Sequence, residues 1–282
     1  QYEGAMAAAD QALVYFSPEV VAHKKLPALS IDEVSKGFGG DVLVCQTTEQ
    51  VLTFIQNIDW HNKVLLMMSS GNFDGIDYDA LGAAIDHLHS TTQTRVFAVV
   101  ATGGTTNLGI IDDLATIAEA THARDIWFHV DGAYGLAGLC APSVRHLYNG
   151  IEDADSFIVD PHKWLFAPFD ACALVYRNPA LAKETHTQHA SYLETLHDDS
   201  WSPSDYAIHL TRRVRGLPFW FSLAAHGTDA YSEAVEEGIR LAKESAKRIA
   251  AHPNLELVRE PELSIVAFTR KGWTPAQYQE WS

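Results

Sequence analysis

The sequence has few cysteines, no long hydrophobic run and a deficit of positive charge. Its three cysteines, Cys45, Cys140 and Cys172, are far apart and odd in number, which argues against a disulfide framework or a zinc site and predicts reduced thiols, as in the cytoplasm. No apolar run reaches about 18 residues and no basic-then-apolar leader precedes one, so neither a membrane span nor a secretory signal is expected. The 20 Lys and Arg residues against 36 Asp and Glu give a net charge of −16, which argues against a nucleic-acid partner.

Internal repeats and low-complexity tracts are also missing, and strand-like apolar runs alternate with helix-like segments instead. This alternation over 282 residues predicts an α/β architecture with a largely parallel sheet. Runs that are apolar on both faces are typical of buried parallel strands. The expected strands are residues 12–16, 41–45, 63–68, 95–101, 126–130, 156–159 and 171–176.

Two segments show helical periodicity. Leu114, Ile117 and Ala118 have the spacing of a core-facing stripe, with Asp112 or Asp113 as the N-cap. A longer helix is expected over 231–251, where His252 and Pro253 end it. Residues 255–268 then predict strands of a smaller second domain, followed by the start of another helix.

Chemically useful side chains follow three of the expected strands. Lys163 comes after 156–159, Asp131 comes after 126–130, and a Thr-Gly-Gly-Thr-Thr turn at 102–106 follows 95–101. Because ligands of open α/β sheets bind at the carboxyl ends of the strands, these groups are expected to face one crevice. Alone, each is more often a solvated lysine, a capping aspartate or a plain turn. Together they match pyridoxal phosphate, which needs a lysine for an imine, a carboxylate for the pyridine nitrogen and groups that hold a phosphate.

Several motifs then carry a family resemblance. Segments 104–114, 129–134 and 155–164, supported by 142–150 and 210–217, closely resemble the group II pyridoxal-phosphate decarboxylases, which include aromatic-amino-acid, glutamate, tyrosine and diaminobutyrate decarboxylases. The resemblance covers about residues 77–282. It implies a fold-type I large domain over 77–225 and an incomplete small α+β domain over 226–282. It also implies decarboxylation of a small-molecule L-amino acid by a cytoplasmic homodimer.

The resemblance further implies a role for each matching residue. These are Lys163 as the Schiff-base lysine, Asp131 as the pyridinium partner, Ala133 under one ring face, Asp160 and His162 beside the phosphate, Thr106 near the ring hydroxyl with Thr105 in the same cofactor site, and Tyr206 as the loop tyrosine that returns a proton after carbon dioxide leaves. Two alternatives stay open: His162 caps a turn, and Tyr206 is an exposed loop tyrosine. No metal is expected.

The first 76 residues resemble another family. Segments 7–18, 23–26 and 60–73 look like the last domain of a Mur ligase of the murein tripeptide type. The ATP-binding central domain of such a ligase is absent, so ligase activity is not expected. The join near 71–78 indicates a chimera, an engineered recombinant or a misjoined reading frame. The alternatives to a working decarboxylase are a catalytically inactive chimera or fragment, and a ligase-type binding module without ligase activity.

Two cofactor-binding features of the decarboxylase family have no clear match. The glycine-rich phosphate turn is not found, and His23 reads better as a solvated histidine than as the one that stacks on the ring. Among the early strand ends, only Ser69–Asn72 could present backbone amides to an anion. Weak cofactor binding is therefore expected unless this turn lies over Lys163.

Overall fold

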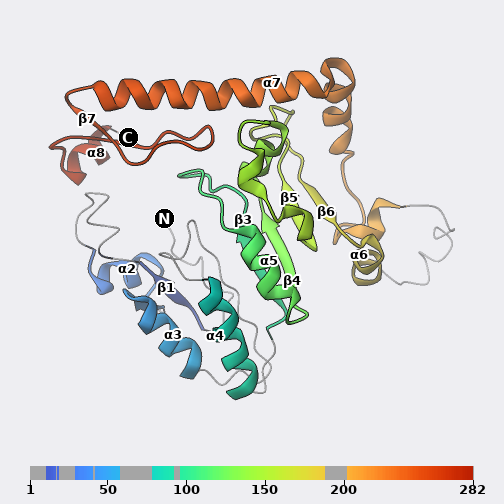
Figure 1. Cartoon of the computed structure of the whole chain (residues 1–282), viewed down its shortest axis with the longest axis horizontal. Helices are drawn as coiled ribbons and strands as arrows, with labels where there is room; N and C mark the ends of the chain where they lie inside the picture. The colour runs from blue at the N-terminus through green and yellow to red at the C-terminus, as the bar shows by residue number, and fades with distance from the viewer. Residues whose placement is uncertain are drawn as a thin grey trace.

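The computed structural model describes residues 11–16, 18, 29–40, 42–57, 78–91, 96–187 and 202–281 (Figure 1). The predicted strand at 63–68, the Ser69–Asn72 turn and His23 lie outside the described residues, as does the join up to residue 77.

The N-terminal unit is a short parallel strand pair with helices beside it. β1 (Leu13–Tyr15) pairs with β2 (Leu43–Cys45), which confirms the strands predicted at 12–16 and 41–45. Helix α2 (Ile31–Gly37) lies between them in the chain, and a capping box between Ser30 and Glu33 begins it. Helix α3 (Thr48–Asn57) follows β2.

The central sheet has the order β3-β4-β5-β6. Its strands are β3 (Ala98–Thr102), β4 (Trp127–Asp131), β5 (Ser156–Val159) and β6 (Ala173–Tyr176). The first three are parallel, as predicted, whereas β6 is antiparallel to β5. The connection from 160 to 172 contains a turn but no helix, and a parallel return would need a longer crossover.

Helix α5 (Leu114–His122) covers one face of this sheet by packing on β3 and β4. Asp113 is its N-cap and accepts from Thr116 N. Asp112, the other predicted cap, instead accepts a hydrogen bond from Thr102 N at 2.8 Å, so it joins the helix start to the end of β3. Helix α4 (Tyr78–Thr91) packs against α5, and Arg124 makes two hydrogen bonds to the carboxylate of Asp86.

Helix α7 (Gly216–Ala251) is longer than predicted because it joins two helices across a kink at Gly227, where φ is 76° (Figure 1). Its second part matches the predicted 231–251 helix and ends at His252. The buried stripe of this part is Tyr231, Val235, Ile239, Ala242 and Ala246. The start of this second part packs on the short 3-10 helix η1 (Gly135–Cys140), where Ser232 Oγ donates to Cys140 O.

The remaining elements are short helices and a strand pair. They are the 3-10 helices η2 (Arg145–Tyr148), η3 (Ile151–Asp153) and η4 (Pro203–Tyr206), helix α6 (Pro179–His186), the antiparallel pair β7 (Leu255–Leu257) and β8 (Phe268–Arg270), and helix α8 (Pro275–Trp281). Within the described part of the chain, no helix is both long and apolar enough to cross a bilayer.

The turn after β4 lies directly against the turn after β3. A Cβ added to Gly135 would overlap Gly103 O and the Cα of Gly104, so no side chain fits there. The Tyr148 hydroxyl donates to Gly135 O from the other side and is itself buried. Glycine is therefore required at position 135 by close backbone packing.

We expect Gly135→Ala to lower the free energy of unfolding by about 2 kcal/mol or more, because the backbone atoms of Gly103 and Gly104 would have to move. The matched control is Gly216→Ala, where an added Cβ meets nothing within 4 Å, and its effect should stay within about 1 kcal/mol. Urea unfolding of both variants measures the difference. Equal stabilities would mean that the two turns can separate without cost.

Candidate active site

The carboxyl ends of β3, β4 and β5 meet at one edge of the sheet. Thr102 pairs with Asp131, and Asp131 pairs with Ile158, so these three parallel strands end in step. The turn that carries Lys163 follows β5 directly. The arrangement expected from the order of the motifs is thus the arrangement observed.

Strand alternation places three polar side chains on one face at this edge. Asp131 pairs with Ile158 on β5, and Ile158 pairs with Leu174 on β6. Because side chains alternate between faces with a period of two, Asp160 and Cys172, two residues beyond that pair, extend to the same face. The carboxylate of Asp160 accepts a hydrogen bond from the Cys172 thiol, which agrees with this placement.

Lys163 also reaches this face. Its Nζ lies 3.0 Å from Oδ2 of Asp160, and its backbone N–H donates to Asp160 O at 2.9 Å. The lysine side chain keeps 37% of its surface exposed, whereas that of Asp160 keeps 14%. The amine is therefore held by a carboxylate and still open to a ligand.

Asp131 and Ala133 form the facing turn. Ala133 N donates to Oδ1 of Asp131 at 3.1 Å, and Ala133 O accepts from Asp160 N at 2.9 Å. The second bond ties the turn after β4 to the turn after β5. The small Ala133 side chain is partly buried between Asp131 and the lysine turn.

A stacked aromatic pair joins the turn after β4 to the turn after β5. Tyr134 stacks on Trp164 with ring centroids 5.2 Å apart and planes 16° from parallel. The Tyr134 hydroxyl is 2.6 Å from Ser264 Oγ. Trp164 also packs on α7 at Gly238, where an added Cβ would lie 3.1 Å from the indole Nε1. Both rings are buried, so the residues on either side of them are held in place.

His162 contacts the protein backbone. Its Nδ1 lies 2.6 Å from Ala171 O and 3.1 Å from Ala171 N, and the ring edge meets Phe169 with centroids 5.0 Å apart. The ring thereby holds the lysine turn against the start of β6. This contact fits the turn-capping alternative, and a role beside a phosphate stays a prediction.

The two threonines differ in their surroundings. Thr105 is buried, and its Oγ1 accepts from Ile110 N at 3.1 Å, so its hydroxyl closes the loop after β3. Thr106 is exposed on that loop. Only Thr106 therefore has a side chain open to a ligand.

Tyr206 is not brought to this edge within the chain. It lies on η4, which packs against α6, and α6 follows the far end of β6 (Figure 1). The near end of β6, Ala173, is the one that pairs with Val159 beside the lysine turn. Tyr206 thus lies beside α6, which follows the end of β6 that is away from the lysine turn. Its role as a proton donor stays a prediction from the resemblance alone.

The structure adds Cys172 to the site. Partial desolvation, the hydrogen bond to Asp160 and the negative charges of Asp160 and Asp131 raise the pKa of the Cys172 thiol to about 11, while the charge of Lys163 lowers it. The charges of all three groups thus act on this one thiol. A lone cysteine has no motif, so sequence reasoning missed it.

Comparison with protein families gives this geometry a context. Residues 41–271 match the family model described as the pyridoxal-dependent decarboxylase conserved domain. The chain belongs to this family. The match begins within the segment assigned above to a ligase-like domain, so the decarboxylase-family part of the chain is longer than the motifs indicated.

The chain is also similar to individual proteins of known name or structure. The chain is 33% identical to an aromatic-L-amino-acid decarboxylase from Rattus norvegicus over 235 residues, which cover 82% of this chain and 48% of that protein. A Bacillus atrophaeus relative of the same name is 33% identical over 63% of this chain and 38% of its own length. The crystal structure of mouse CSAD is 26% identical, with a TM-score of 0.62 over 96% of this chain and 50% of that one. The chain thus spans half or less of the length of these relatives.

We expect the Cys172 thiol of this decarboxylase-family chain to resist alkylation when no cofactor is added. Since the thiolate is the nucleophile, the rate should rise with pH towards a midpoint near 11, and at pH 8 it should be about a hundredfold below that of a thiol with the ordinary pKa of 9.0. Asp160→Asn should speed alkylation by removing a negative charge, and Lys163→Met should slow it. Mass spectrometry of the iodoacetamide-labelled peptide measures both.

The control for these two variants is Glu244→Gln, which removes a charge from an ion pair with Arg248 on α7 and should leave the rate unchanged. An Asp160→Asn rate equal to that of the parent would show that Asp160 does not contact the thiol.

Proposed function

We propose that this chain is the Lys163-bearing part of a pyridoxal-phosphate-dependent L-amino-acid decarboxylase, a carboxy-lyase. The observation that carries the proposal is that Lys163, Asp160 and Asp131 follow neighbouring strands at one sheet edge, with the lysine amine 3.0 Å from the Asp160 carboxylate. Membership of the decarboxylase family supports it. Because the chain spans half or less of its relatives, the activity is proposed for the whole protein to which such a chain belongs.

The donor set at the sheet edge fits the ring end of pyridoxal phosphate. Lys163 offers a partly exposed amine, and Asp131 offers an exposed carboxylate on the same face. Ala133 would pack under the ring, and the exposed Thr106 would lie near its hydroxyl. Asp160 and His162 would stand towards the phosphate. When bound, the cofactor supplies an electron-accepting ring that stabilises negative charge on the carbon that loses carbon dioxide.

Each of these residues would have a separate role around such a ring. Lys163 Nζ would bond to the cofactor aldehyde, and Asp160, 3.0 Å away, would hold the amine in place. Asp131 would keep the proton on the pyridine nitrogen, since a negative charge beside a protonated base favours its protonated form. The Tyr134–Trp164 stack fixes both turns, so the distance between amine and carboxylate is set before a ligand arrives.

The substrate is proposed only as a class, an L-amino acid. The relatives named above act, by their names, on aromatic L-amino acids. The assignment of Tyr206 as the group that returns a proton rests on the resemblance and has no support from its place in this chain.

We further propose a cytoplasmic homodimer. The three cysteines of the described chain are unpaired, as is usual in a reducing compartment. Large apolar side chains are exposed near the site and at the start of α7, and such surfaces commonly mark an interface. They are Phe166, Phe169, Val214, Leu217, Trp220 and Phe221.

The division into segments 1–76, 77–225 and 226–282, and the ligase-like character of the first, stay predictions. The ligase-type module would bind a UDP-linked sugar without ligating it. A catalytically inactive chimera would keep the lysine and the fold but release no carbon dioxide.

Covalent attachment of the cofactor tests the proposal. Pyridoxal phosphate added to the chain and reduced with borohydride should label Lys163, as located by mass spectrometry, and Lys163→Ala should abolish the label. Lys243→Ala, an exposed lysine on α7, is the matched control and should be labelled at Lys163 like the parent. A parent chain that takes up no label at Lys163 would contradict the proposal.

The rate of carbon dioxide release distinguishes the role of Asp131 from that of Lys163. Asp131→Asn should still be labelled at Lys163, because Asp131 makes no bond to the aldehyde. In the whole protein that contains this chain, the variant's release of carbon dioxide from amino acids should fall by about two powers of ten or more, at about 1.4 kcal/mol per tenfold. Labelling without any carbon dioxide release from the whole protein that contains this chain would favour the inactive-chimera alternative.

A further inference from the structure

We infer that Ser264 is a positioning residue for Lys163: its hydroxyl, bonded to the Tyr134 hydroxyl, fixes the aromatic stack beside the turn that carries the lysine amine. The inference rests on the proposed function, because Lys163 is the proposed attachment point of the cofactor. Ser264 itself lies about a hundred residues further along the chain, in the loop that joins β7 to β8.

The loop between β7 and β8 has a defined conformation. Val258 N donates to Ala267 O at 2.9 Å, which extends the strand pair by one step, and the Arg259 guanidinium donates to the Glu262 carboxylate at 2.8 Å. Pro261 is buried, and its ring restricts the backbone before the tip of the loop. The loop extends along α7 towards the central sheet (Figure 1). It therefore brings a distant part of the chain to the candidate site.

Leu263 anchors the tip of this loop in the core. Its side chain is fully buried and belongs to the main hydrophobic cluster. A Cβ added to Gly104 would lie 3.0 Å from Leu263 Cδ1, and one added to Gly109 would lie 3.3 Å from Leu263 Cβ. The leucine thus packs directly on the loop after β3. Because removing a buried leucine from the core is unfavourable, the next residue, Ser264, is held beside the site.

Ser264 lies where two turns of the site meet α7. Its Oγ is 2.6 Å from the Tyr134 hydroxyl. A Cβ added to Gly238 of α7 would lie 3.6 Å from Ser264 Cβ and 3.1 Å from the indole Nε1 of Trp164. Tyr134 belongs to the turn after β4, and Trp164 follows Lys163 directly in the turn after β5. The serine is therefore in contact with the tyrosine and close to the tryptophan.

The Tyr134 hydroxyl is a neutral group that depends on Ser264 for its hydrogen bonds. Burial raises the pKa of this hydroxyl, and its hydrogen bonds with the side chain and the backbone of Ser264 lower it in part. The net direction is upward, so the hydroxyl keeps its proton at neutral pH and can donate and accept at once. Since buried hydroxyls are normally bonded, the Ser264 contact restricts the orientation of the tyrosine ring.

Trp164 connects the tyrosine ring to the lysine. The two rings are stacked with centroids 5.2 Å apart, so a tilt of Tyr134 would displace the indole. The neighbouring Lys163 has its amine 3.0 Å from the Asp160 carboxylate. Loss of the Ser264 hydroxyl would loosen the stack and lower the fraction of molecules whose amine is in place. Binding of a ligand to the amine would weaken by that fraction.

Hydrogen exchange tests the inference without a cofactor. The amides of Asp160 and Lys163 are the reporter amides, because Asp160 N donates to Ala133 O and Lys163 N donates to Asp160 O, each at 2.9 Å. Ser264→Ala should speed exchange of both about fivefold, as expected for loss of one neutral hydrogen bond. Ser264→Thr, which keeps a hydroxyl, should stay near the parent. NMR resolved to single amides measures the rates.

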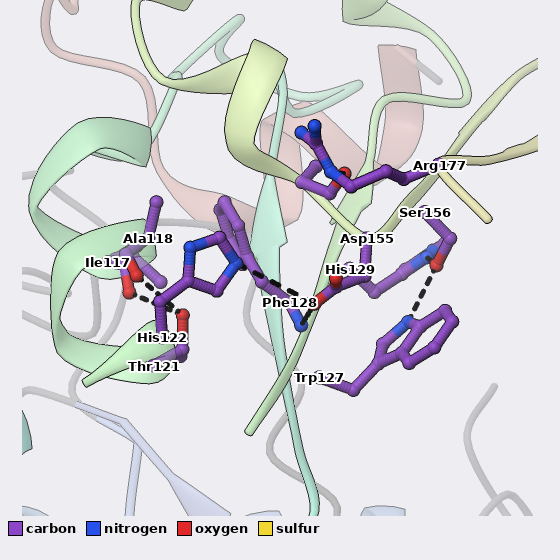
Figure 2. A network of polar contacts seen from close by, with 11 residues as sticks. Ile117, Ala118, Thr121, His122, Trp127, Phe128, His129, Asp155, Ser156 and Arg177 are labelled. Atoms are coloured by element: carbon purple, nitrogen blue, oxygen red, sulfur yellow. Dashed lines mark hydrogen bonds and ion pairs between the residues drawn. The ribbon is translucent and has the colours of Figure 1, made fainter. Parts of the chain in front are cut away.

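The matched control is Thr121→Val, which also removes a buried hydroxyl. Thr121 Oγ1 donates to Ile117 O at 2.8 Å and to Ala118 O at 3.0 Å (Figure 2). Because both bonds stay within α5, the exchange rates of the reporter amides should not change. Equal acceleration of these amides by Thr121→Val and Ser264→Ala would overturn the inference, since any lost hydroxyl would then have the same effect.

Labelling of Lys163 with pyridoxal phosphate and borohydride, at a cofactor concentration below saturation, tests the effect on the amine. Ser264→Ala should lower the label about fivefold. In a Tyr134→Phe background, which keeps the ring stack, Ser264→Ala should cause no further loss, because the two hydroxyls act through one contact. Mass spectrometry measures the label.

Parent-like exchange or parent-like labelling in Ser264→Ala, or additive losses in the double-mutant cycle, would each overturn the inference. A parent chain that takes up no label at Lys163 would instead overturn the proposed function. The exchange rates of the reporter amides would still decide whether Ser264 positions the lysine turn.

Discussion

The close approach of three backbone turns is the constraint on which the site depends. Gly135 lies against Gly103 and Gly104, and Ala133 O accepts from Asp160 N. These contacts join the ends of β3, β4 and β5 before any side chain is considered. Because these contacts are made by backbone atoms, the distances among the three turns change little. The turns therefore hold the backbone positions of the charged residues in place.

This edge of the sheet holds a positive charge although the chain as a whole is strongly negative. The chain carries a net charge of −16, yet the site holds its lysine amine 3.0 Å from one carboxylate and on the same face as another. Each carboxylate has a separate partner: Asp160 bonds to the amine, and Asp131 accepts from a backbone N–H. Each acidic group at this edge of the sheet thus has a hydrogen-bond donor of its own.

Part of this arrangement was predictable because it follows strand ends. Asp131 and Lys163 come directly after apolar runs, so their edge could be inferred from periodicity and from the rule that ligands bind where parallel strands end. Tyr206 lies on η4 beside α6, so its proposed role could be suggested only by a loop match and stays a prediction. The helix over 216–226 escaped prediction because the exposed Trp220 and Phe221 obscure the short stripe of Phe219 and Leu223, which packs against the core.

Cys172 and His129 could be assigned to this edge of the sheet only from the strand register. Cys172 meets Asp160 only because β6 is antiparallel to β5, which depends on a connection without a crossover helix. His129 reads in the sequence as one polar residue within an apolar strand, and its only signal was its position two residues before Asp131.

Strand β4 shows why five residues can serve both stability and chemistry. Phe128 and Val130 are fully buried on the face towards α5, which anchors the strand through the hydrophobic effect. That anchoring forces Trp127, His129 and Asp131 to the opposite face, where Ser156 bonds to the first two. A shift of one residue in register would expose the two core side chains and bury Asp131. The burial that stabilises the sheet therefore also determines which edge and which face carry the carboxylate.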